Sequence, residues 1–230
     1  MTLAVFETRE AAADHVAALL EGGLRQQLAA SGEAALLLSG GSTPEPVYER
    51  LGACDLDWRR VEIGLVDERW VSEDDPASNA GLVQRTLMTG AASAARFHPM
   101  KTPAKHPAPA LAERDLPYSR MCLAAPLILL GMGPDGHIAS WFPGATGLGG
   151  VMDTQNARVL GAVDARGSAV AGDHPVRMTL TARALLGAGL AVLFVTGEEK
   201  RTVLENRSAG LPVHAAEVLL GDKLKEVWAP

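Results

Sequence analysis

The sequence has little cysteine, no long apolar run and no excess of positive charge, and each lack excludes a class of protein. Its 230 residues include two cysteines, Cys54 and Cys122. Their spacing matches neither a CxxC pair nor a metal site, so we expect reduced structural thiols. The formal net charge of -6 gives no general attraction to nucleic acid or to an anionic membrane surface. An anionic ligand would therefore need a local group of cations.

No segment is long and apolar enough to predict a membrane span. The most apolar stretch, residues 123–132, is about half of the ~20 residues that cross a bilayer. Charged residues between Glu7 and Asp14 stand where a signal peptide needs an apolar region, so we expect a cytoplasmic protein. With 47% hydrophobic residues the chain can bury a substantial core, and we expect residues 1–230 to form a single domain.

Short apolar runs alternate with longer amphipathic stretches along the chain. This alternation predicts an α/β fold, a Rossmann-like domain with a mostly parallel sheet flanked by helices. In such sheets, ligands bind beyond the carboxyl ends of the strands. The predicted strands are residues 34–38, 61–66, 127–130, 158–163 and 190–195, and the predicted helices are residues 9–30, 79–88 and 198–206.

Two segments are rich in residues that interrupt regular structure. Five prolines in residues 99–117 predict a surface connection with a short helical piece near residues 108–114. Four glycines in residues 144–150 predict a mobile loop.

Residues 131–137 read GMGPDGH and directly follow a predicted strand. The glycines fit the dinucleotide pattern G-x-G-x-x-G, but Pro143-Gly144 would stop any following helix after about two turns, which argues against a nucleotide cofactor. A histidine here can instead accept a proton near neutral pH, because its reference pKa is about 6.5. An ordinary turn with His137 packed beneath Trp141 or Phe142 explains this loop equally well.

Groups that could bind an anion follow two other predicted strands. Residues 39–44 read SGGSTP and precede a helix whose free amides favour a phosphate, although an N-cap at Ser42 or Thr43 explains them as well. After the next strand, Asp67 and Glu68 should point in different directions, while Arg69 could clamp a carboxylate or phosphate. A solvated charged turn is the alternative there.

Two further cations are expected near the site, one in a loop and one at the start of a helix. Arg177 lies in the segment HPVRMTLT, and Lys200 falls in the first turn of a predicted helix. A cation at that position opposes the helix dipole unless an anion is bound. Pairing of Lys200 with a neighbouring glutamate is the alternative.

Together these segments resemble the 6-phosphogluconolactonase family, and they follow its order over nearly the whole chain. The similar segments are SGGSTP at 39–44, DERWV at 67–71 followed by Ser78-Asn79, GMGPDGH at 131–137 with Ser140, Phe142 and Pro143, and RMTLT at 177–181.

The resemblance implies hydrolysis of 6-phospho-D-glucono-1,5-lactone to 6-phospho-D-gluconate in the oxidative pentose phosphate pathway, without metal or nucleotide cofactor. It implies that His137 deprotonates the attacking water and that Asp135 orients His137. The partner would be the phosphosugar lactone, with no nucleic acid or membrane, and the chain would be a monomer or small homo-oligomer. The residues expected to bind the substrate and its phosphate are Gly41, Ser42, Thr43, Asp67, Arg69, Arg177 and Lys200.

Two other functions fit parts of the sequence. Glucosamine-6-phosphate deaminases, of the same superfamily, continue a similar Asp-Gly-His loop with an Asn-Glu-Pro sequence that carries an acid for ring opening. Here the stretch is Ser140-Trp141-Phe142-Pro143, so that glutamate is absent. A non-catalytic sugar-phosphate sensor is the second alternative, but it would usually carry a DNA-binding helix pair, and none is evident before residue 34.

Overall fold

The computed structural model describes residues 3–230 and contains two sheets. The larger sheet has seven strands in the order β1-β10-β9-β6-β2-β3-β5, and every neighbouring pair is parallel. The smaller sheet has the antiparallel order β4-β8-β7. The strands are β1 (Ala4–Val5), β2 (Ala34–Leu38), β3 (Val61–Leu65), β4 (Asp67–Arg69), β5 (Arg96–Phe97), β6 (Leu127–Leu130), β7 (Leu160–Asp164), β8 (Val176–Leu180), β9 (Leu190–Thr196) and β10 (Leu224–Ala229).

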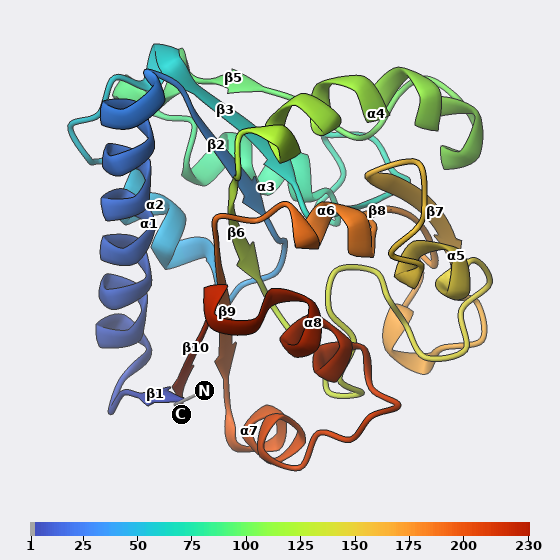
Figure 1. The fold of residues 1–230 in the computed structure, drawn as a ribbon. Helices are drawn as coiled ribbons and strands as arrows, with labels where there is room; N and C mark the ends of the chain where they lie inside the picture. The colour runs from blue at the N-terminus through green and yellow to red at the C-terminus, as the bar shows by residue number, and fades with distance from the viewer. Residues whose placement is uncertain (1–2) are drawn as a thin grey trace.

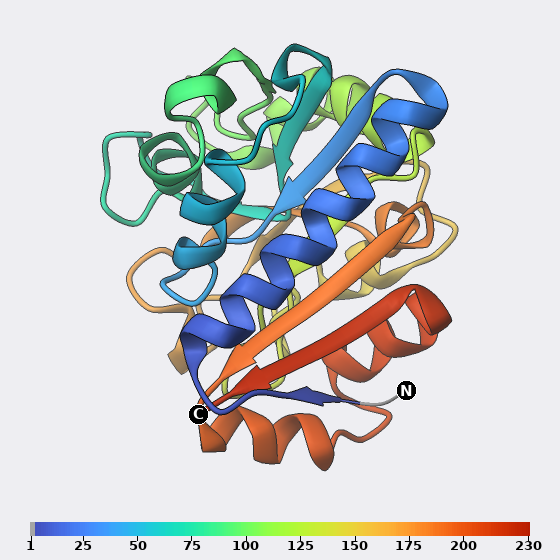
Figure 2. The same cartoon turned by 90° about the vertical axis from the view of Figure 1, so that its left-hand side faces the viewer.

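Helices cover both faces of the parallel sheet, as the alternating sequence pattern predicts. Helix α1 lies across one face (Figure 2), and α4, α6 and α8 lie on the opposite side (Figure 1). The helices are α1 (Arg9–Ser31), α2 (Glu45–Gly52), α3 (Asn79–Thr86), α4 (Pro107–Leu123), α5 (Leu148–Met152), α6 (Ala182–Leu186), α7 (Glu198–Glu205) and α8 (Pro212–Leu220).

The ends and the buried face of α1 follow directly from its sequence. Thr8 accepts a hydrogen bond from the Ala11 amide at 3.1 Å, which satisfies one free donor of the first turn. Gly32 ends the helix with φ of 79°, a conformation that costs glycine little. Val16 and Leu20, four residues apart, are buried against the sheet, as helical periodicity requires.

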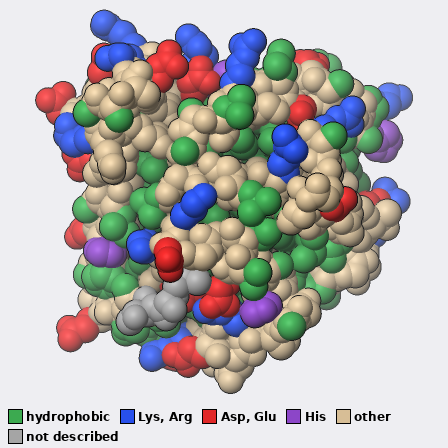
Figure 3. All heavy atoms as spheres, viewed as in Figure 1, with side chains coloured by type: hydrophobic (Ala, Val, Ile, Leu, Met, Phe, Trp, Pro, Cys, Tyr) green, Lys and Arg blue, Asp and Glu red, His purple; other side chains and the backbone are tan. Residues whose placement is uncertain are grey.

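The central strands are covered on both faces. Every residue of β2 and of β6 is buried, which explains their continuous apolar sequence. No helix in residues 3–230 is long and apolar enough to cross a membrane. On the face shown in Figure 3, acidic and basic side chains are interspersed.

The strand expected at 158–163 is displaced, and it does not join the parallel sheet. It forms β7, which pairs antiparallel with β8. From Gly161 to Asp164 its residues alternate between buried and half-buried, which is typical of a strand covered on one face in an antiparallel sheet. Arg177 and Asp67, expected in loops or turns, lie on strands β8 and β4 of this same sheet.

The proline-rich and glycine-rich segments are more regular than expected. Helix α4 begins at Pro107, where a proline loses no needed N–H, and it continues through Pro117 at the loss of one internal hydrogen bond. Gly147, with φ of 92°, begins the short helix α5 within the segment expected as a mobile loop. By contrast, no helix follows His137, since residues 137–146 form turns and bridges.

Parallel pairing brings four strand ends to one edge of the sheet. The order β9-β6-β2-β3 places the loops after these strands side by side. Val66 joins the two sheets there, because its amide donates to Leu38 at 2.7 Å and its carbonyl accepts from Leu180 at 2.9 Å. The segments that carry the predicted site residues therefore meet at the carboxyl ends of the central strands, as expected.

Candidate active site

The loops at this edge surround a cavity of about 290 Å³. Its wall includes nearly every residue that the sequence predicts for the site. Only Asp135 is not part of the wall, and it contacts His137, which is. The predicted residues that line the cavity are Gly41, Ser42, Thr43, Asp67, Arg69, His137, Arg177 and Lys200.

Asp135 holds the His137 ring from one side. Its Oδ1 lies 2.5 Å from the ring Nδ1 and also accepts from the His137 backbone amide at 3.2 Å. Burial alone would raise the pKa of Asp135, but the hydrogen bond and charge of His137 outweigh burial and hold that pKa below its ordinary value. No residue within 3–230 bonds to the His137 Nε2, so this nitrogen can accept a proton.

Gly133 and Gly136 allow the loop to turn and the His137 ring to fold back over it. A Cβ on Gly133 would lie 2.1 Å from Cε1 of His137, so the imidazole folds back over the loop only because residue 133 has no side chain. Gly136 has φ of 77°, which glycine adopts at little cost. The loop is closed by a hydrogen bond from the Gly133 amide to the His137 carbonyl at 2.9 Å. The turn therefore explains Gly133 and Gly136, whereas a Cβ on Gly131 would make only an ordinary contact with the Ser39 hydroxyl at 3.8 Å.

The His137 ring packs on Phe142, as the ordinary alternative proposed, and it still faces the cavity. The two ring centroids are 4.1 Å apart with an interplanar angle of 34°. Trp141 instead points into the core, where its Nε1 donates to the Leu180 carbonyl at 2.8 Å. Packing and a chemical role are thus compatible at His137.

The SGGSTP loop presents free donors to the cavity. Pro44, and not Ser42 or Thr43, occupies the N-cap position of α2, and no side chain bonds to the helix amides there. Within residues 3–230, the backbone amides of residues 41–43 bond to no other backbone group. The Thr43 hydroxyl lies 3.2 Å from that of Thr196 at the end of β9. Free amides beside the start of a helix are suited to bind an anion.

Lys200 reaches the same cavity from the first turn of α7. The pairing with a neighbouring glutamate is not observed, because no ion pair to Lys200 occurs between residues 3 and 230. Burial lowers the pKa of Lys200, and the nearby Glu199 opposes that shift. A half-buried ammonium group without a carboxylate partner at a helix start favours an anionic ligand.

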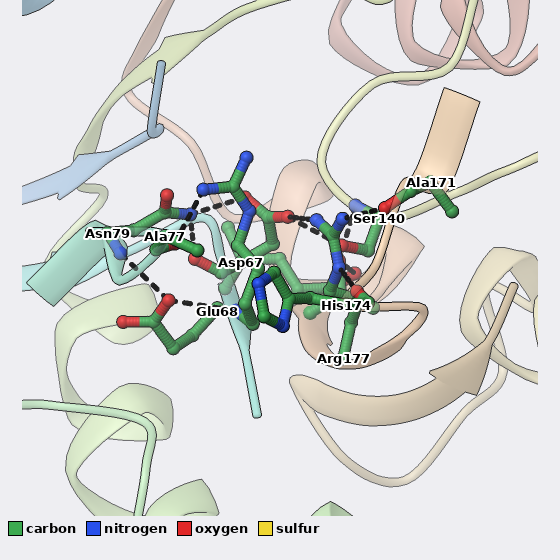
Figure 4. A network of polar contacts seen from close by, with 11 residues as sticks. Asp67, Glu68, Ala77, Asn79, Ser140, Ala171, His174 and Arg177 are labelled. Carbon is green, nitrogen blue, oxygen red and sulfur yellow. Dashed lines mark hydrogen bonds and ion pairs between the residues drawn. The ribbon is translucent and has the colours of Figure 1, made fainter. Parts of the chain in front are cut away.

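The adjacent carboxylates of β4 point in different directions, as predicted, but neither is solvated. Asp67 faces the cavity, and its Oδ2 accepts from the Ser140 hydroxyl at 2.5 Å and lies 3.6 Å from an Arg177 nitrogen (Figure 4). Its backbone carbonyl accepts from the Asn79 amide group at 2.8 Å. Asp67 therefore ties three separate segments together at the cavity wall.

Glu68 is fully buried on β4, and its carboxylate bonds to the groups at the start of helix α3. Its carboxylate accepts from the backbone amides of Arg69, Asn79 and Ala80 at 2.8–2.9 Å and from the Ser78 hydroxyl at 3.1 Å. Burial raises the pKa of Glu68, while these donors act against the shift. The carboxylate positions α3, and with it the Asn79 side chain that bonds to Asp67.

Arg177 is held rigidly beside the His137 loop. Its Nε donates to the His174 carbonyl at 2.5 Å, and its Nη2 donates to the Ala171 carbonyl at 3.0 Å. The guanidinium carbon lies 5.3 Å from the centre of the Phe142 ring. Burial lowers the pKa of Arg177, and the charge of Asp67 opposes this. Arg177 is therefore a fixed cation close to the candidate base.

Comparison with known proteins is consistent with this geometry. Residues 7–221 match the family described as glucosamine-6-phosphate isomerases/6-phosphogluconolactonase. This chain belongs to that family. A 6-phosphogluconolactonase from Xylella fastidiosa (strain 9a5c) is 39% identical over 217 residues, with 91% of this chain and 88% of the relative covered. A 6-phosphogluconolactonase from Caulobacter vibrioides is 36% identical, and the match covers 99% of this chain and 97% of the relative.

Solved structures of the family share the fold. The crystal structure of a 6-phosphogluconolactonase from Shewanella baltica OS155 matches with a TM-score of 0.86 and 30% identity, covering 100% of this chain and 98% of that one. A monomeric glucosamine-6-phosphate deaminase matches with a TM-score of 0.77 and 20% identity. The match covers 100% of this chain and 97% of that one. That second likeness shows the shared fold alone.

Several residues of the site were not predicted to take part in it. Asn79 and Ser140 stand in segments that resemble the family, but no pattern in the sequence predicts a role for either residue. They are 12 and 73 residues from Asp67, so no local pattern shows these contacts. Phe142 was expected only as packing for His137, and its contact with Arg177 depends on the pairing of β8 with β4 and β7.

Glu68→Gln should lower the free energy of unfolding by about 2 kcal/mol, because the amide nitrogen of glutamine cannot accept from the buried donors that now bond to Glu68. Chemical denaturation at pH 7 measures the change. Glu73→Gln, at an exposed position, is the matched control and should stay within ~0.5 kcal/mol of the parent. Equal stability of both variants would contradict the role of Glu68.

Asp135→Asn should cost about 1 kcal/mol of stability at neutral pH. Because the folded pKa of Asp135 lies below its unfolded value of about 3.9, this contribution is present above that pH and is lost as the pH falls through the folded pKa. Denaturation curves between pH 7 and pH 2 should therefore converge for the two proteins at low pH. A difference that persists unchanged at pH 2 would argue against the Asp135–His137 pair as its source.

Proposed function

We propose that this chain hydrolyses 6-phospho-D-glucono-1,5-lactone to 6-phospho-D-gluconate, the lactonase step of the oxidative pentose phosphate pathway. The observation that carries the proposal is the arrangement of His137. Asp135 holds one ring nitrogen, and the ring lines the same cavity as a free cation and free backbone amides. We further propose that residues 1–230 act as a single domain in the cytoplasm, without metal or cofactor.

The reaction needs a base and later an acid at the lactone carbonyl. His137 Nε2 takes a proton from water as the water oxygen attacks C1, and Asp135 stabilises the imidazolium that results. The tetrahedral intermediate then breaks the bond between C1 and the ring oxygen. The imidazolium returns its proton to that oxygen, which leaves as the C5 hydroxyl. A δ-lactone is an activated ester, so no covalent intermediate on the protein is required.

Arg177 supplies the positive charge that the intermediate needs. Its guanidinium and the His137 ring both contact Phe142, so we assign Arg177 to the carbonyl end of the substrate. Asp67 and the two backbone carbonyls hold the guanidinium before the substrate arrives. A fixed donor of this kind contributes about 10²- to 10³-fold to the rate of acyl transfer.

The phosphate is assigned to the opposite side of the cavity. Gly41, Ser42 and Thr43 offer amides and hydroxyls at the start of α2, and Lys200 offers a cation without a carboxylate partner. Arg69 remains available to either end of the substrate. Binding energy at the phosphate would place the lactone against His137 and its water.

The chemistry of the wall favours a lactonase over a deaminase. Among the described residues, Asp67 is the acidic side chain that lines the cavity. Its carboxylate is engaged by Ser140 and Arg177. Residues 140–143, where the deaminase acid would stand, instead supply Ser140 to Asp67 and Phe142 to His137. Ammonia release from glucosamine 6-phosphate would nevertheless reveal that alternative directly.

His137→Asn should lower kcat by about 10²-fold or more at neutral pH, because the base is lost while the side chain keeps its approximate size. The assay follows freshly prepared lactone with phosphogluconate dehydrogenase as reporter, after subtraction of the spontaneous rate. His214→Asn, on α8 and outside the cavity, is the matched control and should retain the parent kcat. A folded His137→Asn protein with undiminished kcat would remove His137 from the mechanism.

Lys200→Ala should raise KM about 10-fold or more with little change in kcat, because a charged hydrogen bond to the phosphate is lost in the ground state and the transition state alike. Hydrolysis of unphosphorylated glucono-1,5-lactone should be unaffected by the same substitution. If the phosphorylated substrate keeps its KM, the phosphate lies elsewhere.

A further inference from the structure

Phe142 contacts both of the groups assigned to the carbonyl end. Its ring packs on His137 with 4.1 Å between centroids and a tilt of 34°, and the Arg177 guanidinium carbon lies 5.3 Å from the centre of the same ring. The side chain is 1% exposed and still forms part of the cavity wall. One buried ring thus lies against the candidate base and the candidate carbonyl donor.

The same ring supports the backbone that holds Arg177. Phe142 forms a small buried cluster with Ala165 and Ala171, separate from the main core. The Ala171 carbonyl accepts from Arg177 Nη2 at 3.0 Å. A change in the position of the ring would therefore shift Arg177 through the direct contact and also through the Ala171 carbonyl.

We propose that Phe142 is a positioning residue for the lactonase reaction, which sets the placement of His137 relative to Arg177. The part of this inference that is tested by kcat rests on the proposed function. Phe142 touches no reacting atom in this account. It restricts the orientation of the imidazole ring and fixes the distance between that ring and the Arg177 guanidinium.

An aromatic ring suits this task better than an aliphatic side chain. A flat ring restricts the tilt of a stacked imidazole, and its electron-rich face attracts a cation. The attraction to His137 increases when that ring becomes an imidazolium in the tetrahedral intermediate. Leucine would fill much of the space without providing either effect.

Phe142→Leu should lower kcat about 10-fold with a change in KM below about threefold, because the ring packs on His137 and Arg177 and on none of the groups assigned to the phosphate. Phe142→Tyr keeps the aromatic face and should restore most of kcat. Phe194→Leu is the matched control, since Phe194 is also buried and lines the cavity but stacks on neither His137 nor Arg177. It should lower kcat clearly less than Phe142→Leu when melting temperatures are comparable.

Proton NMR of the histidine rings tests the stacking without catalysis. In the parent protein the His137 ring protons should be shifted upfield by the Phe142 ring current, with assignment from His137→Asn. The shift should be lost in Phe142→Leu and kept in Phe194→Leu. A parent-like kcat in Phe142→Leu, an equal loss in both leucine variants, or an unchanged His137 shift would each overturn the proposal. If the parent protein does not hydrolyse the lactone, the proposed function fails, while the NMR result still decides whether Phe142 positions the ring.

Discussion

The buried carboxylate of Asp67 is the interaction on which the site depends. Burying a charge is costly unless it is paired and hydrogen-bonded, and here Ser140, Arg177 and Asn79 surround it. These partners come from the segment after the histidine loop, from β8 and from α3. Satisfying one carboxylate therefore fixes three chain segments relative to each other. The rigid placement of Arg177 beside His137 follows from this requirement.

The two ends of the cavity are built by different means. The end assigned to the phosphate uses free backbone amides after β2 and a cation on the helix after β9, which parallel strand pairing brings together. The end assigned to the carbonyl uses side chains held by other side chains, with Asp135, Phe142 and Asp67 as the supports. An anion can be bound by a preformed loop, whereas proton transfer needs a ring held in one orientation.

Much of this arrangement could be predicted from the sequence because its signals are local. Strands β2, β6 and β9 are nearly continuous apolar runs, and β3 is interrupted by the half-buried Glu62. The loops that follow these strands had to meet at one edge. The second sheet was not predicted, because β4 and β8 contain charged and polar residues whose partners come from distant segments of the chain. Pro117 was taken as an interruption, although a long helix tolerates one missing hydrogen bond when its face is buried.

Within the site, the histidine and its aspartate were predictable because they stand two residues apart. The two carbonyl groups that bond to Arg177 beside Asp67 were not predictable, because their positions depend on the turn before β8. The glycines of the segment GMGPDGH were also open to two interpretations in the sequence. The middle glycine of the pattern that suggests a dinucleotide loop is required here by the imidazole ring over Gly133.

A crystal structure with the product 6-phospho-D-gluconate would show which end of the substrate lies beside His137. We expect the phosphate at the amides of residues 41–43 and at Lys200, with the C1 carboxylate beside His137 Nε2 and Arg177, an orientation that should be the same in every copy. A phosphate bound at Arg177, with C1 directed toward Lys200, would contradict it.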